Sequence, residues 1–242
     1  MEVEAKKSYS FCNDISKADT LAIIVAAGYS SRMGGVNKLF CDLLGIPVIA
    51  RTLLAYQRFD SIGGIVVATR EESIPDLQKL CEQFGITKLV AIVKGGATRS
   101  ESVKNAVDAA DARFKYFAIA DGARPLTSND EIEKTLEAAM RFSAAACAVK
   151  VSDTIKLCDD SQFILSTPDR SKLWAAQTPQ IFNAELYKSA LSRFYGEYTD
   201  DCAMIEAAGV KVKLVEGSYK NIKITTPTDL IIAKAFLEEE NL

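Results

Sequence analysis

The chain has 242 residues, of which 48% are hydrophobic and 25% charged, and its formal net charge is −3. This length suits one large α/β domain, and the weak negative charge provides no basic field to attract nucleic acid or an anionic membrane surface. Histidine is absent, which excludes a Ser-His-Asp triad and histidine-based acid–base catalysis. Any bound metal would therefore need oxygen ligands, the preference of Mg²⁺.

The six cysteines are dispersed and form no Cys-x-x-Cys pair, so we expect reduced thiols in a cytoplasmic protein. No apolar run is long enough to suggest a membrane span. Residues 1–19 contain no apolar core of signal-peptide length, and we predict that they form a flexible tail before a single domain at 20–242.

From Thr20 onward, short apolar runs alternate with amphipathic stretches. This alternation predicts βαβ units in an α/β, Rossmann-like, doubly wound and mostly parallel sheet. The predicted strands are Leu21–Ala27, Gly64–Thr69, Lys88–Val93, Tyr116–Ala120 and Ala144–Val149. The predicted helices are Pro47–Arg58, Ile74–Phe84, Arg99–Ala112 and Asn129–Phe142, the first opened by Pro47 and the last by a capping box of Ser128 and Glu131.

The rhythm changes after Val149, where two β-prone runs, Val151–Cys158 and Phe163–Thr167, flank a polar turn. We predict a β-hairpin that projects from the sheet as an arm of about residues 151–176. A two-stranded hairpin is marginally stable alone, so we expect the arm to pack on a partner subunit. Further on, the pattern predicts helices at 183–194, near 200–208 and after Pro227, and a strand at Lys211–Val215.

The segment from Gly28 to Lys38 follows the first predicted strand and consists mainly of small and polar residues, with Arg32 and Lys38 as its cations. Open α/β sheets bind ligands at the carboxyl ends of their strands, and backbone N–H groups of small residues come close to anions there. A phosphate-binding loop is one interpretation. An ordinary strand-to-helix turn with solvated cations is the other.

Other clusters also follow predicted strands. Asp121 could anchor a Mg²⁺ that bridges phosphates, or it could cap the next turn. The pair Gly95-Gly96, with Ser102 one helical turn further on, permits close approach of a base or ribose, although a helix start capped by Thr98 explains the same residues. Lys223 lies in an alternating pattern that predicts a strand, and a lone lysine there is usually solvated.

Taken together and in this order, these segments resemble the 2-C-methyl-D-erythritol 4-phosphate cytidylyltransferase family of the non-mevalonate isoprenoid pathway. The resemblance spans nearly the whole chain, from Ala26 to Asp229. The matching residues are Ala26-Ala-Gly28, Ser31-Arg-Met-Gly34, Lys38, Gly95-Gly96, Arg99-x-x-Ser102-Val, Asp121-x-Ala-Arg-Pro125, Asp153-Thr154, Asp169-Arg170, Leu173-Trp174, Gln177-Thr-Pro-Gln180 and Asn221-Ile-Lys223.

The resemblance implies a nucleotidyltransferase that moves CMP from CTP to 2-C-methyl-D-erythritol 4-phosphate, giving CDP-methylerythritol and pyrophosphate. It also implies a Mg²⁺ cofactor and a homodimer in which the arm embraces the partner, so that each acceptor site is shared. The implied roles are catalysis for Arg32, Lys38 and Lys223; CTP binding for Ala26, Ala27, Gly28, Gly96 and Ser102; acceptor binding for Arg124, Thr154 and Arg170; and metal binding for Asp121.

Three places differ from the family's usual pattern. Asn37 stands where a proline precedes the loop lysine, and Ala97 stands where an acid follows the paired glycines. Asp121 is flanked by Ala120 and Gly122-Ala, where the family usually has a histidine and Ala-Ala. A sister family, ribitol-5-phosphate cytidylyltransferase, is the alternative with nearly the same site. Ala-Ala-Gly at 26–28 and Asp169-Arg-x-x-Leu-Trp174 favour the methylerythritol family. A nucleotide-binding module without catalysis is the alternative from a different class.

Overall fold

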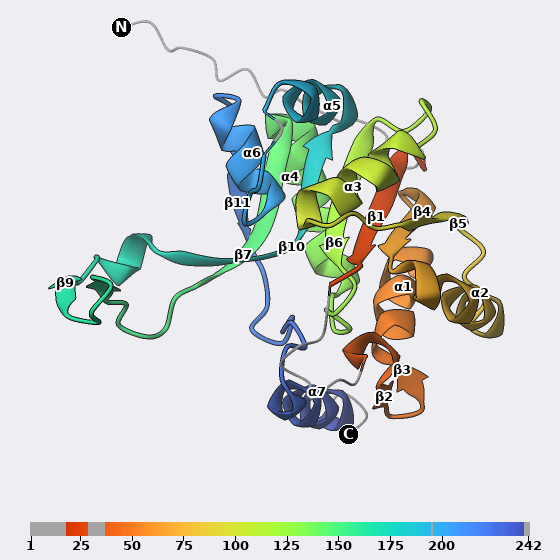
Figure 1. Ribbon diagram of the computed structural model, residues 1–242, viewed down its shortest axis with the longest axis horizontal. Coiled ribbons are helices and arrows are strands. Elements are labelled where there is room, and N and C mark those ends of the chain that lie inside the picture. The colour runs from red at the N-terminus through yellow and green to blue at the C-terminus, as the bar shows by residue number, and fades with distance from the viewer. Residues whose placement is uncertain (1–17, 29–36, 195, 240–242) are drawn as a thin grey trace, which may run out of the picture.

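The computed structural model describes residues 18–28, 37–194 and 196–239. A seven-stranded sheet crosses the molecule, with helices on both of its faces (Figure 1). The spatial order of its strands is β11 (Lys213–Glu216), β7 (Ala144–Lys150), β10 (Trp174–Asn183), β6 (Tyr116–Asp121), β1 (Thr20–Ala26), β4 (Ile62–Thr69) and β5 (Leu89–Lys94). Only β10 runs antiparallel to its neighbours, which confirms the predicted mostly parallel sheet.

The central strand β1 is buried on both faces, as its uninterrupted apolar run predicts. Leu21 and Ile23 belong to one core, while Ala22 and Ile24 belong to the other. The first core is covered by α3 (Arg99–Asp108), α5 (Ala184–Arg193) and α6 (Asp201–Ala207); the second is covered by α1 (Val48–Arg58), α2 (Ile74–Gln83) and α4 (Asn129–Phe142).

Most predicted boundaries lie within two residues of those observed, and local capping explains why. The capping box of Ser128 and Glu131 at the start of α4 is confirmed. Pro47 is not the first residue of α1, since it pairs in the short ladder of β2 (Asp42–Leu43) and β3 (Ile46–Pro47). Helix α3 ends before the predicted Ala112, because the side chain of Asp111 accepts a hydrogen bond from Arg113 N at 2.9 Å and forms a turn.

The predicted hairpin is confirmed as an arm that projects from the sheet (Figure 1). Its strands β8 (Leu157–Cys158) and β9 (Ile164–Ser166) are much shorter than predicted. The turn between them is organised by Asp159, whose Oδ1 accepts hydrogen bonds from the backbone N of Ser161 at 3.0 Å and of Phe163 at 2.9 Å. Both strands are exposed, and among the described residues they pair only with each other.

The prediction of a strand around Lys223 is wrong, because residues 221–226 form no ladder. The alternating burial has another cause: Ile224 is fully buried and its backbone N bonds to Ala123 O at 2.8 Å. Helix α7 (Pro227–Glu239) then follows, as predicted, and three short 3₁₀ turns complete the described elements: Lys38–Phe40, Glu71–Ser73 and Arg170–Lys172.

The predicted tail lies outside the described residues except for Ala18 and Asp19. Asp19 already joins the fold, since its carbonyl accepts a hydrogen bond from Lys115 N at 2.8 Å and its carboxylate pairs with Lys115 Nζ at 3.2 Å. Across the described part of the chain, no helix has both the length and the apolar character needed to span a membrane.

Candidate active site

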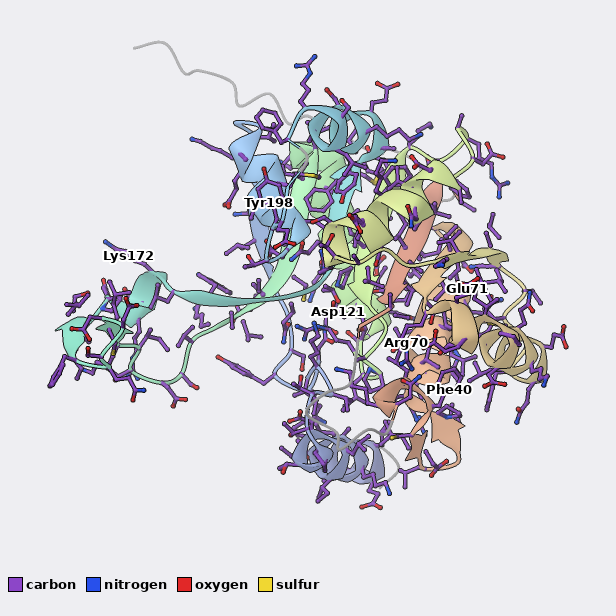
Figure 2. All side chains as sticks on the ribbon, viewed as in Figure 1. Phe40, Arg70, Glu71, Asp121, Lys172 and Tyr198 are labelled. Atoms are coloured by element: carbon purple, nitrogen blue, oxygen red, sulfur yellow. The ribbon has the colours of Figure 1, made fainter. Side chains whose placement is uncertain are left out.

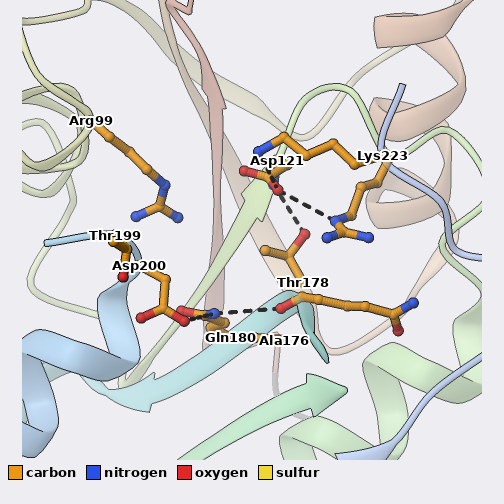
Figure 3. Close-up of a pocket in the computed structure, with 10 residues that line it drawn as sticks. Arg99, Asp121, Ala176, Thr178, Gln180, Thr199, Asp200 and Lys223 are labelled. Carbon is orange, nitrogen blue, oxygen red and sulfur yellow. Dashed lines mark hydrogen bonds and ion pairs between the residues drawn. The ribbon is translucent and has the colours of Figure 1, made fainter. Parts of the chain in front are cut away.

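A pocket of about 360 Å³ opens beyond the carboxyl end of β6, between this strand and β10 (Figure 3). This is the edge of an open α/β sheet where ligands bind. In the close-up, Asp121 and Lys223 point toward each other, and Arg99, Thr199 and Asp200 lie on the other side of the pocket in this view. The lining residues are Arg99, Asp121, Arg124, Ala176, Gln177, Thr178, Gln180, Thr199, Asp200 and Lys223.

Asp121 is the last residue of β6 and is 8% exposed. Its Oδ2 lies 3.0 Å from Lys223 Nζ and 3.3 Å from Arg124 Nε, and its backbone N donates to Thr178 Oγ1 at 3.1 Å. Burial raises the pKa of Asp121, but the positive charges of Lys223, Arg124 and Arg99 outweigh burial, so this pKa lies below its ordinary value. The carboxylate is therefore ionised at neutral pH, and Lys223 is held against it rather than simply solvated.

Arg99 occupies the first turn of α3 and brings a third cation to the pocket. Its Nη1 lies 2.5 Å from Asp201 Oδ2, and the other oxygen of Asp201 accepts the Tyr187 hydroxyl at 2.5 Å. Burial lowers the pKa of Arg99, yet Asp201 and Asp121 raise it more, so the net shift is upward. Three cations converge on a pocket with two carboxylates, Asp121 and Asp200, which favours a ligand with several negative charges.

The predicted nucleotide residues gather beside this pocket, at the ends of β1 and β5. Ser102 is 2% exposed; its Oγ accepts Gly96 N at 3.1 Å and donates to Thr98 O at 2.9 Å. A Cβ on Gly95 would lie 2.3 Å from Ala27 Cβ, so the loop packs directly on the end of β1. Ala26, Ala27, Gly28, Gly96 and Ser102 therefore share one region.

The helix-start interpretation of this loop is confirmed, while its role in CTP binding stays a prediction. Thr98 and Glu101 form a capping box, and Glu101 Oε2 additionally accepts Ala97 N at 2.6 Å. A Cβ on Gly96 would lie 2.1 Å from Glu101 Cβ. The paired glycines are thus required for close approach of the loop to the chain's own residues, whatever ligand the loop receives.

Of the two cations predicted in the first loop, Arg32 lies outside the described residues. Lys38 begins a 3₁₀ turn that Asn37 caps, since Asn37 Oδ1 accepts Leu39 N at 3.2 Å. Asn37 thus has a local role in place of the family's usual proline. The pKa of Asp229, at the start of α7, lies below its ordinary value. Burial raises this pKa, but hydrogen bonds from Thr226 and Thr225 and the positive charge of Lys38 lower it more.

The remaining predicted residues, Thr154 and Arg170, are exposed on the arm. Arg170 donates to Ser152 O at 2.7 Å and so connects the two sides of the arm. Lys172, in the same 3₁₀ turn as Arg170, lies far out on the arm from Asp121 in Figure 2. Neither Thr154 nor Arg170 is among the residues that line the pocket of their own chain.

Several pocket residues received no individual role from sequence reasoning: Arg99, Thr178, Gln180, Thr199 and Asp200. Some signals existed, because Arg99 and the segment from Gln177 to Gln180 are among the matching motifs. For Asp200 the signal was its position at the start of a predicted helix, since it caps α6 by accepting Ala203 N at 3.0 Å.

The doubly wound sheet and the cation-rich pocket at its carboxyl edge fit a Rossmann-like enzyme for phosphorylated ligands, and the family match makes it a nucleotidyltransferase. The family model for 2-C-methyl-D-erythritol 4-phosphate cytidylyltransferase matches residues 20–239. The chain belongs to this family.

Relatives and solved structures agree with this membership. The 2-C-methyl-D-erythritol 4-phosphate cytidylyltransferase of Caldanaerobacter subterraneus subsp. tengcongensis is 45% identical over 90% of this chain and 98% of its own. That of Desulforamulus reducens is 44% identical over 91% and 97%. The crystal structure of 4-diphosphocytidyl-2C-methyl-D-erythritol synthase from Anaerococcus prevotii superposes with a TM-score of 0.81 at 31% identity, covering 93% of this chain and 100% of that one.

Proposed function

We propose that this enzyme transfers CMP from CTP to 2-C-methyl-D-erythritol 4-phosphate and releases pyrophosphate. The observation that carries the proposal is the group of Asp121, Lys223 and Arg124 in one pocket, in a chain whose relatives bear the name of this activity. An acceptor phosphate and a triphosphate together need the several cations that the pocket provides.

In the proposed reaction, an oxygen of the acceptor's phosphate attacks the α-phosphorus of CTP, and the bond between this phosphorus and the bridging oxygen of the leaving pyrophosphate breaks. Nucleotidyl transfer of this kind depends on positioning and on electrostatic stabilisation more than on covalent help. Lys223 would contact the α-phosphate, and Lys38 with Arg32 would hold the triphosphate. Arg124 would bind the acceptor phosphate, which its place in the pocket permits.

The pocket fits a Mg²⁺ ion that arrives with the triphosphate. Asp121 offers an ionised carboxylate, while the residues that the structure describes contain no group of three acidic, cysteine or histidine ligands. Mg²⁺ is commonly bound by one or two carboxylates together with phosphate oxygens and water. Asp121 would hold the ion, and the ion would neutralise charge on the phosphates.

We also propose a homodimer in which each arm completes the partner's acceptor site. The arm exposes five large apolar side chains: Ile155 (39%), Leu157 (56%), Phe163 (72%), Ile164 (61%) and Leu165 (63%). Contiguous exposed apolar residues of this kind mark an interaction surface. Thr154 and Arg170 lie on the same arm and would reach the acceptor phosphate in the partner's pocket. A cytoplasmic location stays a prediction.

The decisive experiment measures pyrophosphate release by the purified protein with CTP and either 2-C-methyl-D-erythritol 4-phosphate or ribitol 5-phosphate. Turnover with the methylerythritol substrate supports the proposal. Robust turnover with ribitol 5-phosphate alone would assign the sister activity instead. Binding of CTP with no turnover of either acceptor would favour a nucleotide-binding module.

A further inference from the structure

The side chain of Asn221 is fully buried two residues before Lys223. Its Nδ2 donates to Glu131 Oε1 at 3.2 Å and to Thr178 O at 3.0 Å. Its Oδ1 accepts the Thr127 hydroxyl at 3.2 Å. The amide is thus held by β10, by the first turn of α4 and by the loop before that helix, so its position is determined from three directions.

The backbone of Asn221 extends this control to the pocket. Its carbonyl oxygen accepts Arg124 Nη1 at 2.6 Å, while Arg124 Nε lies 3.3 Å from Asp121 Oδ2. Lys223, two residues further on, reaches the same oxygen of Asp121 at 3.0 Å. Asn221 therefore orients the guanidinium of Arg124 and fixes the backbone from which Lys223 extends.

The anchor of this arrangement is Glu131, which is 3% exposed. Its Oε2 accepts Ser128 N and Ser128 Oγ, both at 2.9 Å, which is the helix cap. Its Oε1 accepts Ser218 N at 2.8 Å in addition to Asn221 Nδ2. A buried carboxylate is costly unless hydrogen-bonded, and here two of those bonds, from Ser218 N and Asn221 Nδ2, come from the turn that leads to Lys223.

The turn also packs closely against its surroundings. A Cβ on Gly217 would lie 2.3 Å from Cys147 Sγ and 2.7 Å from Gln177 Oε1. Gln177 Nε2 in turn donates to Ser218 O at 2.9 Å and to Asn221 O at 3.3 Å. Little space is left for the turn to move while these contacts persist.

We propose that Asn221, anchored by Glu131, is a positioning residue that sets where Lys223 and Arg124 meet Asp121. The effect on the rate rests on the proposed function, whereas the positioning itself rests on the hydrogen bonds described above. A displacement of about 1 Å in a positioned group can cost about 10²-fold in rate. Lysine has a long flexible side chain, so its backbone anchor decides which positions its ammonium group samples.

The first test compares Asn221→Ala with Ser128→Ala. Asn221→Ala should lower kcat by about 10- to 100-fold and change the KM for CTP much less. Ser128→Ala removes the helix cap and leaves the Oε1 bonds in place, so it should lower the melting temperature by about 2–4 °C with kcat within about twofold of the wild type. Equal loss of kcat in the two variants at equal melting temperature would overturn the proposal.

The second test asks whether Asn221 acts through the pocket cations. In the Lys223→Ala background, Asn221→Ala should cost clearly less than in the wild type, because one of the groups it positions is already absent. A merely structural role predicts that the two fold-losses multiply, and that result would refute positioning.

A crystal structure of Asn221→Ala separates this inference from the proposed function. We expect Lys223 Nζ to leave its 3.0 Å contact with Asp121 Oδ2. Retention of that contact and of the Arg124 geometry would overturn the inference, even if the wild type is fully active. Conversely, a wild-type protein that transfers no CMP would remove the proposed function, while loss of the contact in the variant would still support the positioning role.

Discussion

The substitution Lys223→Ala tests the site most directly, because Lys223 meets Asp121 within the pocket but lies on its exposed rim. Removal of one group that stabilises transition-state charge costs about 2.7–4 kcal/mol, or about 10²–10³ in kcat. The side chain of Lys223 is 46% exposed, against 11% for Asp121. An ion pair with such an exposed partner contributes only about 0–1 kcal/mol to stability, so the loss should fall on activity and not on folding.

The assay is steady-state pyrophosphate release at saturating CTP and methylerythritol phosphate, with the melting temperature measured on the same samples. Lys220→Ala is the matched control, because Lys220 lies on the same segment and pairs instead with Glu239 Oε2 at 2.9 Å. We expect near wild-type activity for Lys220→Ala and a loss of about 10²–10³ for Lys223→Ala. Activity of Lys223→Ala within about threefold of Lys220→Ala would refute the proposed role of this cation.

Three further predictions address the metal, the loop and the arm. Asp121→Asn should weaken the Mg²⁺ dependence of turnover. Because the folded-state pKa of Asp121 is depressed, its contribution to stability is present at neutral pH and is lost as pH falls through that pKa. The variant should therefore be less stable at neutral pH, and its melting temperature should fall less steeply with acid; a pH profile equal to the wild type would contradict the ion pairs described here. Gly96→Ala would place a Cβ 2.1 Å from Glu101 Cβ and should destabilise the protein by about 1–3 kcal/mol and raise the KM for CTP; wild-type values for both would show that the loop adapts. Phe163→Asp should shift the protein toward monomer in analytical ultracentrifugation, and a mixture of Arg170→Ala and Lys38→Ala subunits should regain activity. A wild-type protein that is already monomeric, or a mixture that regains no activity, would exclude the shared site.

The fold was largely predictable from the sequence because its strongest signals are local. The apolar run of β1 contains no polar residue that could face solvent, and both of its faces are buried. The capping box of Ser128 and Glu131 lies within four consecutive residues, and it marks the start of α4 in the structure as it does in the sequence. Where the prediction failed, as at Lys223, an alternating pattern arose from one buried isoleucine bound to Ala123 and not from strand pairing.

The charged residues of the site were partly predictable for a related reason. Parallel strands end at one edge of the sheet, so an acid or a glycine pair after a strand belongs to that edge. This rule locates Asp121 and the Gly95-Gly96 loop. It gives no information about Arg99, whose orientation depends on Asp201, 102 residues further along the sequence, and through it on Tyr187, 88 residues further along.

Asn221 shows most clearly why the rest of the site was out of reach. Its bond to Glu131 joins residues separated by 90 positions, and its carbonyl meets Arg124 across 97. Hydrogen bonds between such distant segments follow no period in the sequence, and neither Glu131 nor Asn221 is unusual in its local pattern: Glu131 looks like a helix cap, and Asn221 looks like a turn residue. A cap that also anchors a distant turn can be recognised only after the chain has folded, and it connects the start of α4 to the position of Lys223.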